Sequence, residues 1–206
     1  DNGLVRTDDA HLSIGEGSAK VKGQYVADTG DFDATINTQD LPLGTFTKDM
    51  TTPITGNIDG EIRILGKNNQ VTDAVGAVEG RQIGIHGVVV DTAKANFTHA
   101  DNRTNITVVG TMGDGALSGY GYIQNGNVDA TISGNALPLT ALSPIIGQDV
   151  DGTLNTSFAI QGTLDNPNVT GTVWGQEVHY KGARFNNIHG DIKLDNHILT
   201  ITNGHI

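Results

Sequence analysis

The sequence predicts an all-β protein: an elongated bent sheet with an apolar concave interior, built from two tandem units of about 96 residues. Residues 21–46 recur without a gap as residues 117–142, and 9 of the 26 aligned residues are identical. Apolar and polar residues alternate with a period of two, and helical periodicity is nearly absent. Such a long period, with several strand signals in each copy, indicates a repeated sheet unit whose copies stack end to end.

In the first unit, alternation predicts strands at residues 11–14, 19–25, 32–36, 58–64, 75–78, 83–89, 93–97 and 106–108. The segment at 41–46, LPLGTF, interrupts the rhythm. Its proline cannot donate to a strand ladder, so we expect a loop or short helical crossover whose leucines cover a rim of the sheet.

In the second unit, the same reasoning predicts strands at residues 128–132, 154–160, 169–173, 178–182, 192–194 and 199–201. Looser matches place Ile58-Asp59-Gly60 over Val150-Asp151-Gly152 and Val78-Glu79-Gly80 over Val173-Trp174-Gly175. We expect the tail of a preceding unit at 1–16, one unit at 17–112 and a second at 113–206, together an excised fragment of a longer protein. Roughly sixteen strands at about 4.8 Å spacing would extend about 75 Å.

Each predicted strand has one apolar face and one face of Asp, Asn, Thr, Lys and Gln, so one side of the sheet is dry. Glycines inside these strands mark bends or close backbone approach: Gly60, Gly84, Gly87, Gly121, Gly171 and Gly182. The residues predicted to line the concave face are Leu12, Ile14, Val21, Phe32, Ala34, Ile36, Ile58, Ile62, Ile64, Ile83, Ile85, Val89, Phe97, Val108, Val128, Ala130, Ile132, Leu154, Phe158, Ile160, Val173, Val178, Tyr180, Ile192, Leu194, Leu199 and Ile201.

Composition narrows the function. A net charge of −11, spread along the chain, argues against nucleic acid and against electrostatic docking on anionic lipid head groups. The chain has no cysteine, which excludes disulfides and thiolate chemistry. An apolar fraction of 36% predicts a thin core, and no apolar run approaches the roughly 20 residues of a membrane span.

No pattern predicts catalysis, a metal site or a cofactor. The seven histidines lack zinc-site spacing, and Asp28, Asp31 and Asp33 form only half of a calcium loop. The serines have no G-x-S-x-G context, and no phosphate-binding loop is present. The single tryptophan, Trp174, has two interpretations: it guards a rim of the groove, or it fills the core beside Gly175.

Residues 162–173 read G-T-L-x-x-P-x-V-x-G-x-V, followed by an apolar strand, Gly182 and IHGDIKLDNHILTI at 188–201. This pattern resembles the repeat of the AsmA-like/TamB family (the translocation and assembly module) of bacteria with two membranes. The first unit fits only through the internal repeat, because residues 66–80 lack the proline.

The resemblance implies a periplasmic β-groove, or β-taco, in a protein anchored in the inner membrane and reaching toward the outer membrane. It implies a non-enzymatic bridge that carries phospholipid acyl chains in a hydrophobic groove and supports outer-membrane biogenesis, with an outer-membrane barrel protein as a possible partner. Two alternatives stay open: a scaffold that assembles outer-membrane proteins by strand pairing, and a surface adhesin or polysaccharide-binding β-solenoid with a closed, filled interior.

Overall fold

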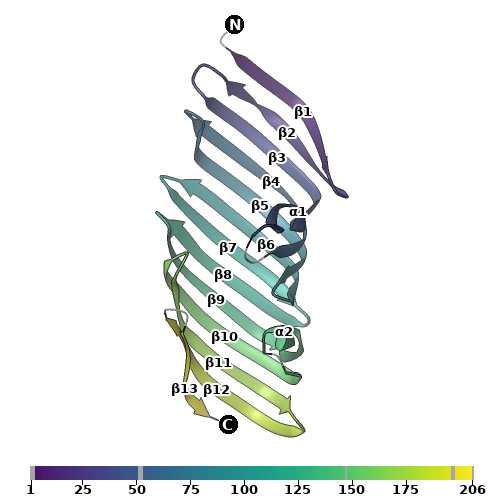
Figure 1. The fold of residues 1–206 in the computed structure, drawn as a ribbon, viewed down its shortest axis with the longest axis vertical. Coiled ribbons are helices and arrows are strands. Elements are labelled where there is room, and N and C mark those ends of the chain that lie inside the picture. The colour runs from purple at the N-terminus through teal and green to yellow at the C-terminus, as the bar shows by residue number, and fades with distance from the viewer. Residues whose placement is uncertain (1–2, 51–52, 147, 196–197, 206) are drawn as a thin grey trace.

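The computed structural model describes residues 3–50, 53–146, 148–195 and 198–205. These residues form one antiparallel sheet of 13 strands, in which each strand pairs with its neighbours in the sequence (Figure 1). The sheet is elongated and bent and does not close into a barrel, which confirms the predicted fold class.

The strands are β1 (Leu4–Ile14), β2 (Gly17–Val26), β3 (Asp31–Pro42), β4 (Ile54–Lys67), β5 (Gln70–Ile85), β6 (Val88–Ala100), β7 (Arg103–Met112), β8 (Gly115–Gln124), β9 (Asn127–Pro138), β10 (Val150–Thr163), β11 (Pro167–Tyr180), β12 (Ala183–Asp195) and β13 (Ile198–His205). Two crossovers contain short helices, α1 (Gly44–Thr47) between β3 and β4, and η1 (Leu139–Leu142) with α2 (Ser143–Ile146) between β9 and β10. None of the described helices has the length and apolar character needed to cross a bilayer.

The expectation of roughly sixteen strands is wrong, because several strands are longer than the alternation indicated. The 16-residue strand β5 alone contains the separate series predicted at 75–78 and 83–89, up to Ile85. Thirteen strands leave twelve intervals, so at about 4.8 Å each the sheet extends about 58 Å.

The two long edges where strands turn back differ in construction. We call "turn rim" the edge formed by residues 27–30, 68–69, 101–102, 125–126 and 164–166, and "helix rim" the edge formed by residues 15–16, 43–50, 86–87, 113–114, 139–146 and 181–182. At the turn rim, Asn68 and Asn69 have φ of 52° and 61°, and Asn125 and Gly126 have φ of 52° and 76°. Two consecutive left-handed residues match the right-handed twist of the flanking strands, which is why asparagine and glycine stand there.

The two units repeat in their irregularities as well as in sequence. Gly56 and Gly152, 96 positions apart, have φ of 108° and 120° and each interrupts the register of its strand pair. Asp40 and Ala136 are a second pair, with φ of 48° and 50°. The kinks therefore recur at one place in each unit, and at a bulge the strand bends and twists more strongly.

These positions correct the loose alignment of Ile58-Asp59-Gly60 over Val150-Asp151-Gly152. Leu41 pairs with Ile58 and Leu137 pairs with Leu154, so Ile58 corresponds to Leu154 rather than to Val150. The gapless match between the units is also interrupted. Gly23 pairs with Ala34 in the first unit, and Gly121 pairs with Ala130 in the second. Equivalent residues are therefore 98 positions apart in β2 and β8 but 96 positions apart in β3 and β9. A shorter turn between β8 and β9 than between β2 and β3 accounts for the two-residue difference.

The leucines of the repeated Leu-Pro-Leu motif lie at the helix rim, where β3 and β9 end and the helical crossovers begin. Leu41 is 9% exposed, and Leu137 and Leu139 are each 5% exposed. The hydroxyl of Thr47 at the end of α1 donates to the Ile54 carbonyl at 2.6 Å and accepts from the Ile54 amide at 3.0 Å. The crossovers are therefore short helices whose leucines cover a rim, one of the two forms that the sequence predicted.

Candidate functional site

One face of the sheet is apolar along its whole length. Strand pairing sets Val21 beside Ile36 and Ile36 beside Ile62, and the same row continues through Phe97 and Ile106 in β6 and β7. Residues two positions along each strand form further cross-strand rows parallel to this one. Because side chains alternate between the two faces of a strand, these rows together form a continuous apolar surface on one side of the sheet.

Strand pairing places the predicted lining residues on this face, with one exception. Leu199 is placed by its backbone pairing with Leu194 alone. The residues so placed are Leu12, Ile14, Val21, Phe32, Ala34, Ile36, Ile58, Ile62, Ile64, Ile83, Ile85, Phe97, Val108, Val128, Ala130, Ile132, Leu154, Phe158, Ile160, Val173, Val178, Tyr180, Ile192, Leu194, Leu199 and Ile201. Their contact with a ligand stays a prediction.

The exception is Val89, whose predicted position is wrong. Ile83 pairs with Val90 and Ile85 pairs with Val88, so Val89 points to the opposite face. Gln82, with φ of 51°, breaks the alternation of β5, and its side chain donates to Asp91 of β6 at 3.0 Å. This local irregularity shifts the apolar positions by one residue, which a period-two pattern does not reveal.

Within the apolar face, a cavity of about 450 Å³ lies over β5 to β9. Its lining joins Ile83 and Ile85, near the helix rim, with Ile123 and Val128, near the turn rim. Because residues from opposite ends of the strands border one cavity, the sheet is concave on this side. We call this surface the groove.

The lining prediction omitted several residues that border the cavity. They are Val90, Ala93, Ile106, Leu117 and Ile123. Each shares a cross-strand row with an apolar residue or glycine, for example Ile106 beside Phe97. The alternation of β7 and β8 contained this signal.

Glycines give the groove its depth because large side chains lie over them. A Cβ added to Gly76 would lie 2.6 Å from the Phe97 ring, and one added to Gly171 would lie 2.6 Å from the Phe158 ring. The ring of Phe32 covers Gly66 in the same way. The Ser157 carbonyl oxygen would also meet a Cβ on Gly171, which agrees with the close backbone approach predicted there; the rings over Gly66 and Gly76 are close approaches of side chains, which the sequence did not predict. Gly87 and Gly182, in contrast, lie in turns, with φ of 83° at each.

No second layer covers the groove in the described part of the chain. None of its large side chains is fully buried, and Ile85 and Ile132 remain 41% and 39% exposed. In an ordinary two-layer domain these positions would be packed against a second element. The groove is thus an apolar surface without its covering layer.

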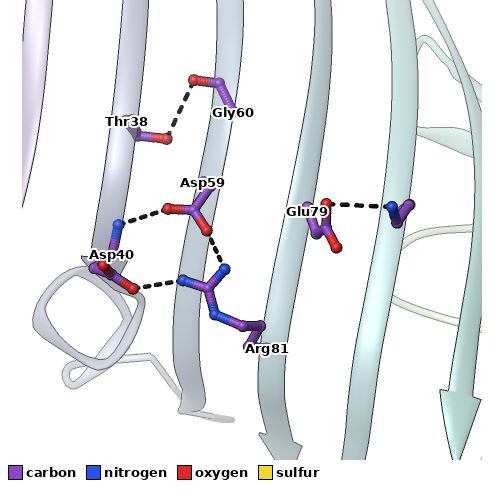
Figure 2. A network of polar contacts seen from close by, with 7 residues as sticks. Thr38, Asp40, Asp59, Gly60, Glu79 and Arg81 are labelled. Atoms are coloured by element: carbon purple, nitrogen blue, oxygen red, sulfur yellow. Dashed lines mark hydrogen bonds and ion pairs between the residues drawn. The ribbon is translucent and has the colours of Figure 1, made fainter.

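The opposite face, which we call the polar face, carries ion pairs between neighbouring strands, together with exposed apolar residues such as Val75, Val109 and Tyr120. Arg63 donates to both carboxylate oxygens of Asp33, at 3.1 and 2.9 Å, and this guanidinium holds the pKa of Asp33 below its ordinary value. Arg81 bridges Asp59 and Asp40 (Figure 2). The backbone amide of Asp40, together with Arg81, lowers the pKa of Asp59. The lowered pKa values keep Asp33 and Asp59 ionised, on the side away from the groove.

Trp174 belongs to this polar face, so neither interpretation from sequence is correct. It pairs with Asn155 on one side and His189 on the other, and it is 40% exposed. Its neighbour Gly175 faces the groove, where Val178 and Ile188 cover it.

The described residues contain no cluster of three or more His, Asp or Glu side chains able to hold a metal ion. Asp33, one of the three aspartates that resembled half of a calcium loop, accepts hydrogen bonds from Arg63. His99 forms a hydrogen bond with the Thr104 hydroxyl at 2.8 Å. His197 lies outside the described residues.

Comparisons with family models, with curated proteins and with solved structures found no match to this chain.

Proposed function

We propose that this protein is a non-enzymatic lipid bridge, whose groove carries phospholipid acyl chains between the inner and outer membranes in support of outer-membrane biogenesis. The observation that carries the proposal is the uncovered apolar face, continuous over the sheet and hollowed to about 450 Å³ in the middle. A membrane-anchored protein in the periplasm is the setting that the resemblance to the AsmA-like/TamB family implies.

The size of the cavity suits an acyl chain. A volume of about 450 Å³ equals about fifteen water-sized units of about 30 Å³ each. Such a volume has room for about fifteen methylene groups of an acyl chain. Full burial of one methylene contributes about 0.8 kcal/mol, so half-burial of about fifteen gains at most about 6 kcal/mol on transfer from water. Part of this gain is offset by lost translational and rotational freedom. Binding of this strength is reversible, as transport requires.

The row structure of the groove supports movement along it. Ile36 and Ile62 in one unit have their counterparts in Ile132 and Phe158 in the next, so similar apolar sites follow one another along the sheet. We expect a chain that leaves one site to meet another apolar site of similar composition along the row. Transport then requires a continuous apolar path and no chemical step.

Mass spectrometry of lipids that co-purify with the protein tests the proposal. We expect phospholipids among the co-purified molecules, displaced by a fluorescent fatty acid with a midpoint in the micromolar range or above. A purified protein that carries no lipid and does not bind the fluorescent chain would refute acyl-chain binding.

A second candidate rests on the open edges of the sheet. β1 and β13 each pair with one strand only among the described residues, so either could pair with a further strand, of this chain or of another. Such edges accept an added strand, which favours a scaffold for outer-membrane proteins that acts by strand pairing. Crosslinking from Ile201 in β13 to a client strand would separate this activity from lipid binding. The adhesin alternative required a closed, filled interior, and this sheet is open.

A further inference from the structure

The two long edges of the groove differ in how well their apolar residues are buried. The buried apolar side chains of the described residues all belong to strand ends or crossovers at the helix rim, and each is 9% exposed or less. They are Ala19, Leu41, Met112, Leu137, Leu139 and Val178. The thin core of this protein is therefore one row of buried apolar side chains along the helix rim, and we call these six residues the seal.

Prolines complete this seal by packing on glycines of neighbouring turns. A Cβ on Gly15 would lie 3.3 Å from Pro42, and one on Gly113 would lie 3.0 Å from Pro138. The same construction thus recurs in both units. In the second unit, Pro144 of α2 also packs against Gly87 in the β5–β6 turn, at 3.0 Å from the added Cβ. The crossover after β9 therefore reaches back past β8 and β7 to the β5–β6 turn.

The turn rim has no comparable seal. Apolar side chains there are open to solvent: Val5 is 62% exposed, Val71 is 49% exposed and Leu164 is 55% exposed. The helix rim also has exposed apolar side chains, Phe46 and Met50 at 54% and 55%, but it has the buried row as well, and among the described residues the turn rim has no such row. Polar groups stand directly beside them. The Tyr25 hydroxyl, for example, donates to the Asn69 side chain at 2.9 Å.

Adjacent turns along this rim are also joined by hydrogen bonds. The Asn102 amide donates to Asn125 of the next turn, and the Leu164 backbone amide donates to the Gly126 carbonyl at 3.0 Å. The turn rim thus combines exposed apolar contacts with a row of amide groups. This combination matches the boundary between the tails and the head of an amphiphile.

We propose that an amphiphilic ligand enters and leaves the groove sideways through the turn rim and keeps its head group there. The head, of a class with hydrogen-bonding oxygens and no net negative charge, such as a zwitterionic glycerol phosphate ester whose amine can pair with the turn carboxylates Asp28, Asp101 and Asp165, lies beside the amide turns, and the tails point toward the helix rim. This inference rests on the proposed acyl-chain binding and adds an orientation to it.

The absence of native cysteine makes a direct test possible, because a single cysteine can carry a fluorophore at either rim. We would label Asn102→Cys at the turn rim and Asp114→Cys at the helix rim. Each labelled protein is then titrated with a phospholipid carrying a nitroxide quencher on its head group, and with one carrying it at the end of an acyl chain. Strands of ten residues separate the rims by about 30 Å, beyond the contact range of a nitroxide.

We expect the head-group nitroxide to quench the Asn102→Cys probe at least threefold more than the Asp114→Cys probe, and the chain-end nitroxide to show the reverse order. Equal quenching of both probes by the head-group nitroxide, or stronger quenching at Asp114→Cys, would overturn the orientation while leaving acyl-chain binding intact. Absence of quenching by either lipid at both positions would overturn acyl-chain binding itself, and the orientation with it.

Discussion

Placing a charge in the middle of the groove gives the most direct test of acyl-chain binding. Ile132 lies on β9, borders the central cavity and is 39% exposed. The substitution Ile132→Asp removes an apolar contact worth about 1.5–3 kcal/mol when fully buried. It also introduces a carboxylate, and an acyl chain lying over this position would have to strip water from it.

Together these two effects should weaken acyl-chain binding by about 3 kcal/mol, which is about a hundredfold in the dissociation constant. The fold should change little, because a position that is more than a third exposed contributes about 1 kcal/mol or less when replaced. Titration with a fluorescent fatty acid measures the first effect, and urea unfolding measures the second.

The matched control is Ser133→Asp, the next residue on the same strand. Ser133 pairs with Ser118 and Ser157 on the polar face, so it adds the same charge on the side away from the groove. We expect its affinity to remain within twofold of the parent protein. Equal weakening by both variants, or an Ile132→Asp affinity within threefold of the parent, would refute the assignment of the groove as the binding surface.

Three further predictions concern the sheet that shapes the groove. Gly76→Val forces the Phe97 ring away from its seat, and overpacking of this kind should lower the free energy of unfolding by about 1–3 kcal/mol in urea; an unchanged midpoint would contradict the close approach. Asn155→Ala leaves the Ala136 amide without its acceptor at 2.9 Å, so we expect a loss of about 1–3 kcal/mol by the same measurement, with Asn155→Asp retaining most of the stability. The pKa of Asp59 is lowered in the folded state, so its stabilising contribution is complete above the unfolded value of about 3.9 and is lost as the pH falls through the lower folded value. Below about pH 4, the unfolding free energy of Asp59→Asn should therefore fall less steeply with decreasing pH than that of the parent protein. An identical dependence on pH in both proteins would contradict the lowered pKa of Asp59.

The apolar face was predictable because one rule, alternation with a period of two, decides which side of a strand each residue faces. The rule holds along the regular stretches of strand in both units, which is why residues as distant as Ile36 and Ile192 were placed on one face. It fails wherever one residue leaves the extended conformation. At Gln82 a left-handed φ changes the phase, and Val90 takes the place predicted for Val89.

The curvature and the seal along the helix rim were less accessible from sequence. The repeated Leu-Pro-Leu motif indicated a covered rim, but the packing of Pro144 on Gly87 joins residues from different hairpins, and no local pattern encodes it. Trp174 shows the same limit, because its large apolar side chain suggested the interior while the pairing with Asn155 fixes it on the polar face. Long-range register, rather than residue type, decided these positions.

The hydrogen bond that holds each bulge has a consequence for how such a groove can grow. In one unit the Asp40 amide donates to Asp59 at 2.8 Å, and in the other the Ala136 amide donates to Asn155 at 2.9 Å. Each unit thus fixes its own bend with its own residues and borrows nothing from its neighbour. Gene duplication could therefore lengthen the sheet one unit at a time while each unit keeps its own bend. The residue that accepts this hydrogen bond is an acid in one unit and an amide in the other, so either side chain supports the kink.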